Sequence, residues 1–86
     1  DLLKSNYLRM TCLMQLKDYR AVVDIAFQSL QRARTQDDLL SLMYAQAEAF
    51  IKLDLISEAR LTLEKIISID SEYRLSRQRL EKLNEI

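Results

Sequence analysis

Only a few side chains in this sequence could do chemistry. Cys12 is the single cysteine, and the chain has no histidine to act as its base. Cys12 lies in an apolar stretch, so we expect a buried small side chain rather than a regulatory thiol. The adjacent carboxylates Asp37 and Asp38 could suggest a cation site. Because neighbouring residues on a helix point in different directions, we interpret this pair as the acidic first turn of a helix.

The residue types that the chain lacks exclude most catalytic motifs. Without glycine there is no phosphate-binding loop and no nucleophile elbow, and without histidine there is no HExxH zinc motif. A single cysteine allows no disulfide within the chain and no CxxC pair. An active site of carboxylates and lysines alone stays open, but no pattern favours one. We therefore expect no catalytic residue, no metal site and no cofactor, and a binding protein rather than an enzyme.

Length and charge further narrow the class of protein to which this chain can belong. The 86 residues allow one small domain, and 13 acidic residues balance 13 basic ones. This neutrality argues against a nucleic-acid partner, and the short apolar runs argue against membrane insertion. The sequence opens without an initiator Met or a leader, so we expect a piece of a longer protein. Its compartment stays open, with the cytoplasm as the default.

Helical periodicity runs through nearly the whole chain. The spacing of apolar residues and the polar breaks predict an all-α fold of five helices, over about 2–16, 18–33, 37–53, 57–69 and 71–85. Asp18 and Thr35 are predicted N-caps, Asp54 begins the next break, and Asp70-Ser71 is expected to start the last helix. Joined by short links, such helices must fold back as antiparallel pairs.

The apolar positions also predict which side chains face the core. The members of this inward set are Leu3, Tyr7, Met10 and Met14; Val22, Val23, Ala26, Phe27 and Leu30; Leu39, Leu42, Met43, Ala47, Phe50 and Ile51; Ala59, Leu63, Ile66 and Ile67; and Tyr73, Leu80, Leu83 and Ile86.

An internal repeat relates two parts of the chain. Residues 12–30 align with residues 49–67 at a spacing of 37 residues, with Leu16 opposite Leu53 and Tyr19 opposite Ile56. One helical hairpin cannot bury its apolar face alone, whereas two stacked hairpins can.

At these residues the sequence resembles the tetratricopeptide repeat family. Ala47, Phe50 and Ala59 match the small and aromatic positions of the motif, and Tyr19 matches an aromatic position of the first unit. The resemblance implies one helical domain over 1–86, with repeats at about 3–36 and 37–71 and a capping helix at about 71–86. Gly is missing from both turns, Met10 occupies a small-residue position, and Asn6 and Arg9 fall where apolar residues are usual.

The resemblance also implies a function. In this family the first helix of each unit lines a concave groove that holds a peptide or a helix of a partner protein. Carried over, the partner-binding groove consists of Lys4, Tyr7, Thr11, Met14, Gln15, Ser41, Tyr44, Glu48, Ile51 and Lys52. Tyr7 and Tyr44 are equivalent by the 37-residue shift. Each alone is interpreted as a half-buried packing residue, and the recurrence favours a recognition role for the pair.

Chaperone C-terminal tails are disfavoured as ligands. Relatives grip their carboxylate with a clamp of Lys, Asn and Arg side chains. The two alignments of the clamp place Leu8, Ser41 and Ala45, or Tyr7, Thr11, Ala45 and Leu75, at the required positions. Neither set supplies the donors, so a mixed apolar and polar partner surface is expected.

Two further alternatives stay open. The chain could be a structural or self-association segment of a longer helical-repeat protein, even a homodimer, with Met14, Ile51 and Leu75 meeting the next hairpin or a second copy. Separately, Arg74, Arg77, Arg79 and Lys82 could form a basic patch for an acidic partner, although neighbouring glutamates dilute it.

Overall fold

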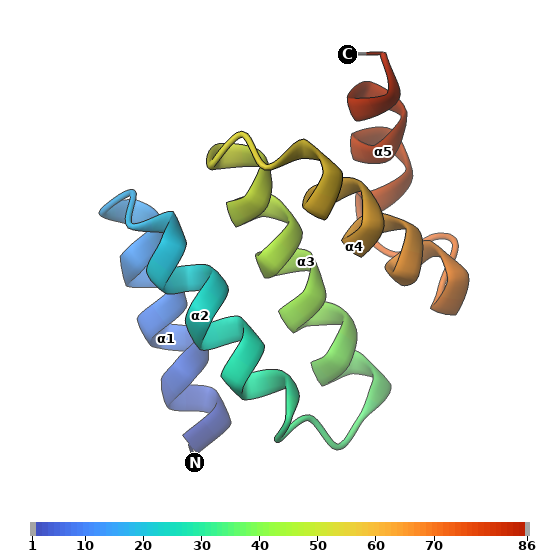
Figure 1. Ribbon diagram of the computed structural model, residues 1–86. Helices are drawn as coiled ribbons and strands as arrows, with labels where there is room; N and C mark the ends of the chain where they lie inside the picture. The colour runs from blue at the N-terminus through green and yellow to red at the C-terminus, as the bar shows by residue number, and fades with distance from the viewer. Residues whose placement is uncertain (1, 86) are drawn as a thin grey trace.

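The computed structural model describes the backbone of residues 2–85 and the side chains of residues 4–85. The fold is all-α, with five helices and no strand over this range. The helices are α1 (Leu2–Gln15), α2 (Tyr19–Leu30), α3 (Gln36–Lys52), α4 (Ile56–Ile69) and α5 (Ser76–Asn84), and successive helices run in opposite directions (Figure 1). The expected antiparallel helices are therefore confirmed. None of the helices in the described part is long and apolar enough to cross a bilayer.

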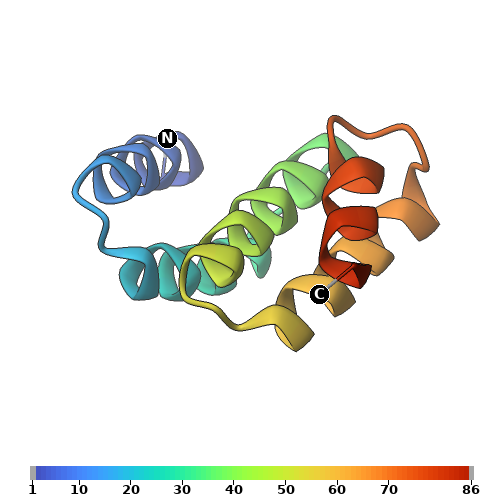
Figure 2. The same cartoon turned by 90° about the horizontal axis from the view of Figure 1, so that it is seen from above.

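The helices form two layers. Seen from above, α1, α3 and α5 lie along one side of the molecule, and α2 and α4 lie along the other (Figure 2). The molecule is flat, with extents of 38, 27 and 17 Å. Helix α3 packs against both α2 and α4, so it joins the two hairpins α1–α2 and α3–α4.

Two apolar clusters stabilise this arrangement. One lies between α1, α2 and α3 around Met10, Val22 and Ala26, and the other lies between α3, α4 and α5 around Leu40 and Leu63. Most of the predicted inward residues are buried or half-buried. Burial of this apolar surface is the main favourable contribution to folding.

The turns after α1 and α3 show how a chain without glycine closes its hairpins. Lys17 and Asp54 have φ of 63° and 61°, in the left-handed region that glycine ordinarily occupies at the end of a helix. After each of them the next backbone N–H, of Asp18 or Leu55, donates to a carbonyl five residues back, of Leu13 or Phe50. Both turns are therefore Schellman motifs, in which these bonds satisfy the free carbonyls of the helix end.

Side-chain caps begin two of the helices as predicted. The Asp18 carboxylate accepts from the backbone N–H of Ala21 at 3.4 Å, and the Thr35 hydroxyl accepts from that of Asp38 at 3.1 Å. Asp37 and Asp38 lie in the first turn of α3, where negative charge is favourable.

The predicted start of the last helix is wrong. Residues 71–75 form turns, and α5 begins only at Ser76. The Asp70 carboxylate accepts from the backbone N–H of Glu72 at 3.1 Å, a local turn that competes with a helical start. Arg74 has a φ of 46°, which redirects the chain so that α5 returns along α4. Helix α2 also ends earlier than predicted, at Leu30 rather than about Ala33.

Two predictions of burial are also wrong. Cys12 is exposed because it lies on the outer face of α1, which no other described helix covers. Phe27 is 62% exposed, since the smaller residues Val22, Val23 and Ala26 form the inner face of α2. The predictions for the side chain of Leu3 and for Ile86 lie outside the described residues.

Candidate functional site

A pocket of about 240 Å³ opens between α1 and α3, at the centre of the predicted groove. Four predicted groove residues line it together with three others, and we call it the α1–α3 pocket: Tyr7, Met10, Thr11, Met14, Ser41, Ala45 and Arg74. Its walls are one face of each helix, because residues spaced by three or four positions share a face. Arg74 reaches it from the turn before α5.

Tyr7 fixes one wall of the pocket. Its hydroxyl donates to the carbonyl oxygen of Asp38 on α3 at 3.2 Å, which links the two helices. Partial burial of the ring, followed by the negative charge of Asp38, raises the pKa of the Tyr7 phenol above its ordinary value. Tyr7 therefore stays neutral at physiological pH and lines the pocket as an uncharged side chain. Thr11 lies one turn further along, with its hydroxyl donating to the Tyr7 carbonyl at 3.0 Å.

Tyr44, the counterpart of Tyr7, is covered by the segment that leads into α5. Its side chain is 7% exposed, and the Tyr73 ring meets it edge to face with centroids 6.0 Å apart. The Tyr44 hydroxyl accepts from Arg79 Nε at 2.9 Å, and Arg79 also pairs with Glu48 at 3.3 Å. The hydrogen bond to Tyr44 raises the pKa of the Arg79 guanidinium. Each tyrosine thus makes a hydrogen bond to the next helix of the same layer: Tyr7 on α1 bonds to α3, and Tyr44 on α3 bonds to α5.

Arg74 supplies the positive charge at the edge of the pocket. Its guanidinium lies over the rings of Tyr44 and Tyr73, with centroid distances of 5.4 and 5.1 Å. No carboxylate among residues 4–85 pairs with it, whereas Arg79 pairs with Glu48 and Arg77 pairs with Glu72. Of the four basic residues of the expected patch, two are therefore engaged in ion pairs. Arg74 remains able to bind an anionic group in the pocket.

The other predicted groove residues lie outside the α1–α3 pocket. Lys4, Gln15 and Lys52 are exposed on α1 and α3, near the ends of the two helices. Ile51 is half-buried against α4 and α5. The structure thus gathers Tyr7, Thr11, Met14 and Ser41 in one opening, and covers Tyr44 and Glu48 with other side chains. That a ligand touches these residues stays a prediction.

The predicted groove did not include three of the lining residues: Met10, Ala45 and Arg74. Met10 and Ala45 lie on the same helix faces as predicted residues, so a wider stripe would have included them. Arg74 was considered only as part of a possible basic patch on the last helix, because its place at the pocket depends on the turn at residues 70–75, which the helical periodicity missed.

The pocket has the composition of a recognition site. Tyr7 and Met14 offer apolar contact, and Arg74 offers a cation. Thr11 and Ser41 add hydroxyl groups, which also bond to the Tyr7 carbonyl and to the Tyr73 hydroxyl. Within the described residues, no group of three or more carboxylates or cysteines is arranged to hold a metal ion.

Comparisons with known proteins found no matching family model, no matching curated protein and no matching solved structure.

Proposed function

We propose that this chain is a non-catalytic interaction scaffold of the tetratricopeptide type, which binds a peptide or a helix of a partner protein in the α1–α3 pocket. The observation that carries the proposal is the α1–α3 pocket and the residues that line it. It joins apolar, hydroxyl and cationic groups, and four of its residues were predicted from the repeat to share a groove.

The backbone supports the proposed repeat. Lys17 and Asp54 are 37 residues apart, share the same left-handed φ, and are followed by residues of nearly equal geometry. Asp18 has φ and ψ of −90° and 70°, and Leu55 has −92° and 72°. The hydrogen bonds from Asp18 to Leu13 and from Leu55 to Phe50 also correspond at this spacing. Two hairpins with the same turn and a final covering helix are the arrangement expected of a short solenoid.

The chemistry of the pocket indicates a ligand with an apolar side chain beside a carboxylate. The apolar group would lie against Tyr7 and Met14, and the carboxylate would bind Arg74, which has no ion-pair partner among residues 4–85. Nucleic acid is a poor candidate, because the net charge is zero and the pocket holds one cation.

Selection of peptides from a random display library, followed by measurement of Kd with fluorescent peptides, tests the proposal. We expect Thr11→Glu to obstruct the pocket and Arg74→Ala to remove the anion contact. Each should weaken binding about tenfold or more, which corresponds to about 1.4 kcal/mol. Tyr44→Ala is a poor test, because truncating this buried ring would leave a cavity in the core.

Two matched variants serve as controls. Ser57→Glu adds a charge to an exposed position of α4, and Arg77→Ala removes an arginine whose ion-pair partner, Glu72, is itself exposed. Both should bind the selected peptides as the unchanged protein does. The proposal fails if the library yields no binder, or if Thr11→Glu and Arg74→Ala bind as tightly as the controls.

A further inference from the structure

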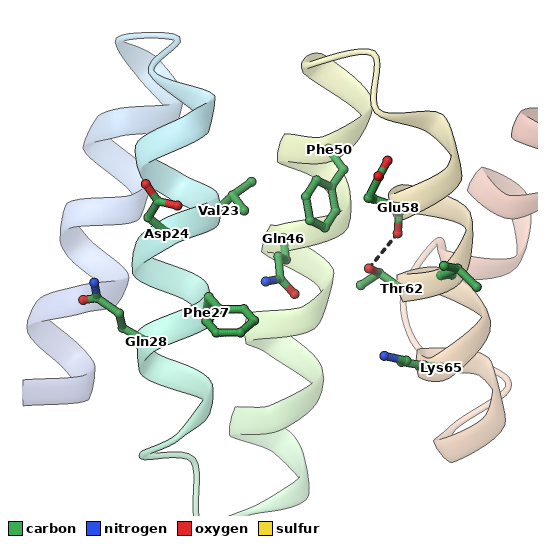
Figure 3. Close-up of a pocket in the computed structure, with 10 residues that line it drawn as sticks. Val23, Asp24, Phe27, Gln28, Gln46, Phe50, Glu58, Thr62 and Lys65 are labelled. Atoms are coloured by element: carbon green, nitrogen blue, oxygen red, sulfur yellow. Dashed lines mark hydrogen bonds between the residues drawn. The ribbon is translucent and has the colours of Figure 1, made fainter.

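A second hollow, of about 460 Å³, lies in the other layer of the molecule (Figure 3). We call it the α2–α4 groove. Gln46 and Phe50 of α3 form its floor, Phe27 of α2 forms one wall, and Leu61 of α4 forms the other. None of these residues belongs to the α1–α3 pocket, so a role for this groove is independent of the proposed function.

The α2–α4 groove leaves apolar and polar groups without partners. Phe27 and Leu61 are 62% and 59% exposed, although large apolar side chains are usually covered. Gln46 is 7% exposed and points between α2 and α4, and its amide makes no hydrogen bond to any residue that the structure describes. Its amide atoms are not fully buried, so they reach solvent at the floor of the groove, where they can exchange water for a polar group of a ligand.

A carboxylate on each wall gives the groove its charge. Asp24 lies on α2 and Glu58 lies on α4, both exposed (Figure 3). Neither has an ion-pair partner among residues 4–85. The complementary occupant is a helix with an apolar stripe, a cation on each side of that stripe and a small polar side chain within it.

Helix α1 has this pattern on its outer face. Leu8 and Cys12, followed by Leu16 in the next turn, form an exposed apolar stripe that no described helix covers. With 3.6 residues per turn, Lys4 and Arg9 fall on opposite sides of the stripe, and the hydroxyl of Ser5 falls within it. Between residues 5 and 17 the only charged side chains are Arg9 and Lys17.

We infer that α1 of one copy of this chain docks in the α2–α4 groove of a second copy, so that the chain associates head to tail. Lys65 lies further along the α4 wall than Glu58 (Figure 3). Its positive charge would repel a cation of the docked helix at that end of the groove. The end of α1 that carries Lys4 and Arg9 therefore lies beside Asp24 and Glu58. The two surfaces differ, so each added copy leaves one groove and one α1 free and the association continues beyond the dimer.

Sedimentation velocity at low salt, with a reductant to keep Cys12 from forming disulfides, tests this inference. We expect the average mass of the unchanged protein to rise past that of a dimer between micromolar and millimolar concentration. Added salt should lower it, because the contact depends on charge. A protein that stays monomeric at millimolar concentration would overturn the inference.

Charge reversal of each surface gives a sharper test. The groove variant Asp24→Lys/Glu58→Lys and the helix variant Lys4→Glu/Arg9→Glu should each be monomeric alone, since their two surfaces then carry the same charge. An equimolar mixture should associate again, because each surface now meets its opposite. Circular dichroism must show unchanged helicity and Tm for both.

Matched controls separate a local contact from a general effect of charge. Glu64→Lys/Glu81→Lys makes the same change of net charge as the groove variant, at exposed positions outside both surfaces, and should associate like the unchanged protein. Loss of association in this control, or a mixture that stays monomeric, contradicts the inference. A monomeric protein that nevertheless binds a synthetic basic amphipathic helix in the groove would also overturn self-association, and would show that another protein is the occupant.

Discussion

The hairpins α1–α2 and α3–α4 bury the same positions with different side chains. Residues 37 positions apart, such as Met10 and Ala47, are both buried, as are Ala26 and Leu63. In these two pairs the larger residue belongs to the first hairpin in one case and to the second in the other. Two hairpins of similar backbone are therefore compatible with different cores as long as the interior is filled.

The sharpest difference lies in one buried pair. In the first hairpin Asn6 donates from Nδ2 to the Ser29 hydroxyl at 2.9 Å, and the equivalent residues of the second are Met43 and Ile66. Both pairs are buried. A polar pair is tolerated inside the first hairpin because the Asn6 amide donor and the Ser29 oxygen are hydrogen-bonded to each other.

Breaking this polar pair should have the greatest consequence for stability. Ser29→Ala leaves the Asn6 amide buried without its acceptor, and we expect it to lower the free energy of unfolding by about 1–3 kcal/mol. The double change Asn6→Met/Ser29→Ile installs the apolar pair of the second hairpin and should cost much less, because no polar group is then left unpaired. Urea denaturation of both variants measures the difference. Equal destabilisation by the two would contradict the equivalence of the hairpins.

Helix caps should show an intermediate effect. Asp18 caps α2 with its side chain, whereas Leu55 at the same place before α4 makes no such bond. Asp18→Ala should cost about 1 kcal/mol. Leu55→Ser should instead raise stability by up to about 1 kcal/mol, because with Glu58 three residues later it completes a capping box. Thermal unfolding followed by circular dichroism measures both, and a destabilising Leu55→Ser would show that packing of Leu55 outweighs the cap.

The left-handed residues should change stability least. Lys17→Gly and Asp54→Gly should each stabilise by about 0.5–1 kcal/mol or less, since glycine relieves the strained φ but loses more entropy on folding. Lys17→Gly should gain more, because aspartate tolerates the left-handed region better than lysine does. The urea midpoints of the two variants measure these gains. Equal gains, or a larger gain for Asp54→Gly than for Lys17→Gly, would contradict the prediction.

The first four helices were predictable to within a few residues because each carries a strong apolar period. Asp18 and Thr35 predicted where α2 and α3 begin, because an N-cap side chain bonds to a backbone N–H only three residues later in the sequence. The predicted start of α5 failed, because the turn at Asp70 competes with a helix and Arg74 adopts a left-handed φ.

The candidate site was predictable in part. Tyr7, Thr11, Met14 and Ser41 share the α1–α3 pocket because helical spacing places them on facing surfaces. The cover over Tyr44 and the approach of Arg74 depend on the path of residues 70–79, which no local period specifies.

Local periodicity and capping were enough to establish the helical class, the short links and most of the residues that face the core. Only the tertiary structure shows that Lys17 and Asp54 adopt the left-handed φ that glycine ordinarily takes. It also brings Arg74 to the pocket without a carboxylate partner among residues 4–85, and it leaves Phe27 lining a second groove. These features escape a reading of the chain because exposure and ion pairing depend on which elements pack together, and that packing joins residues far apart in the sequence.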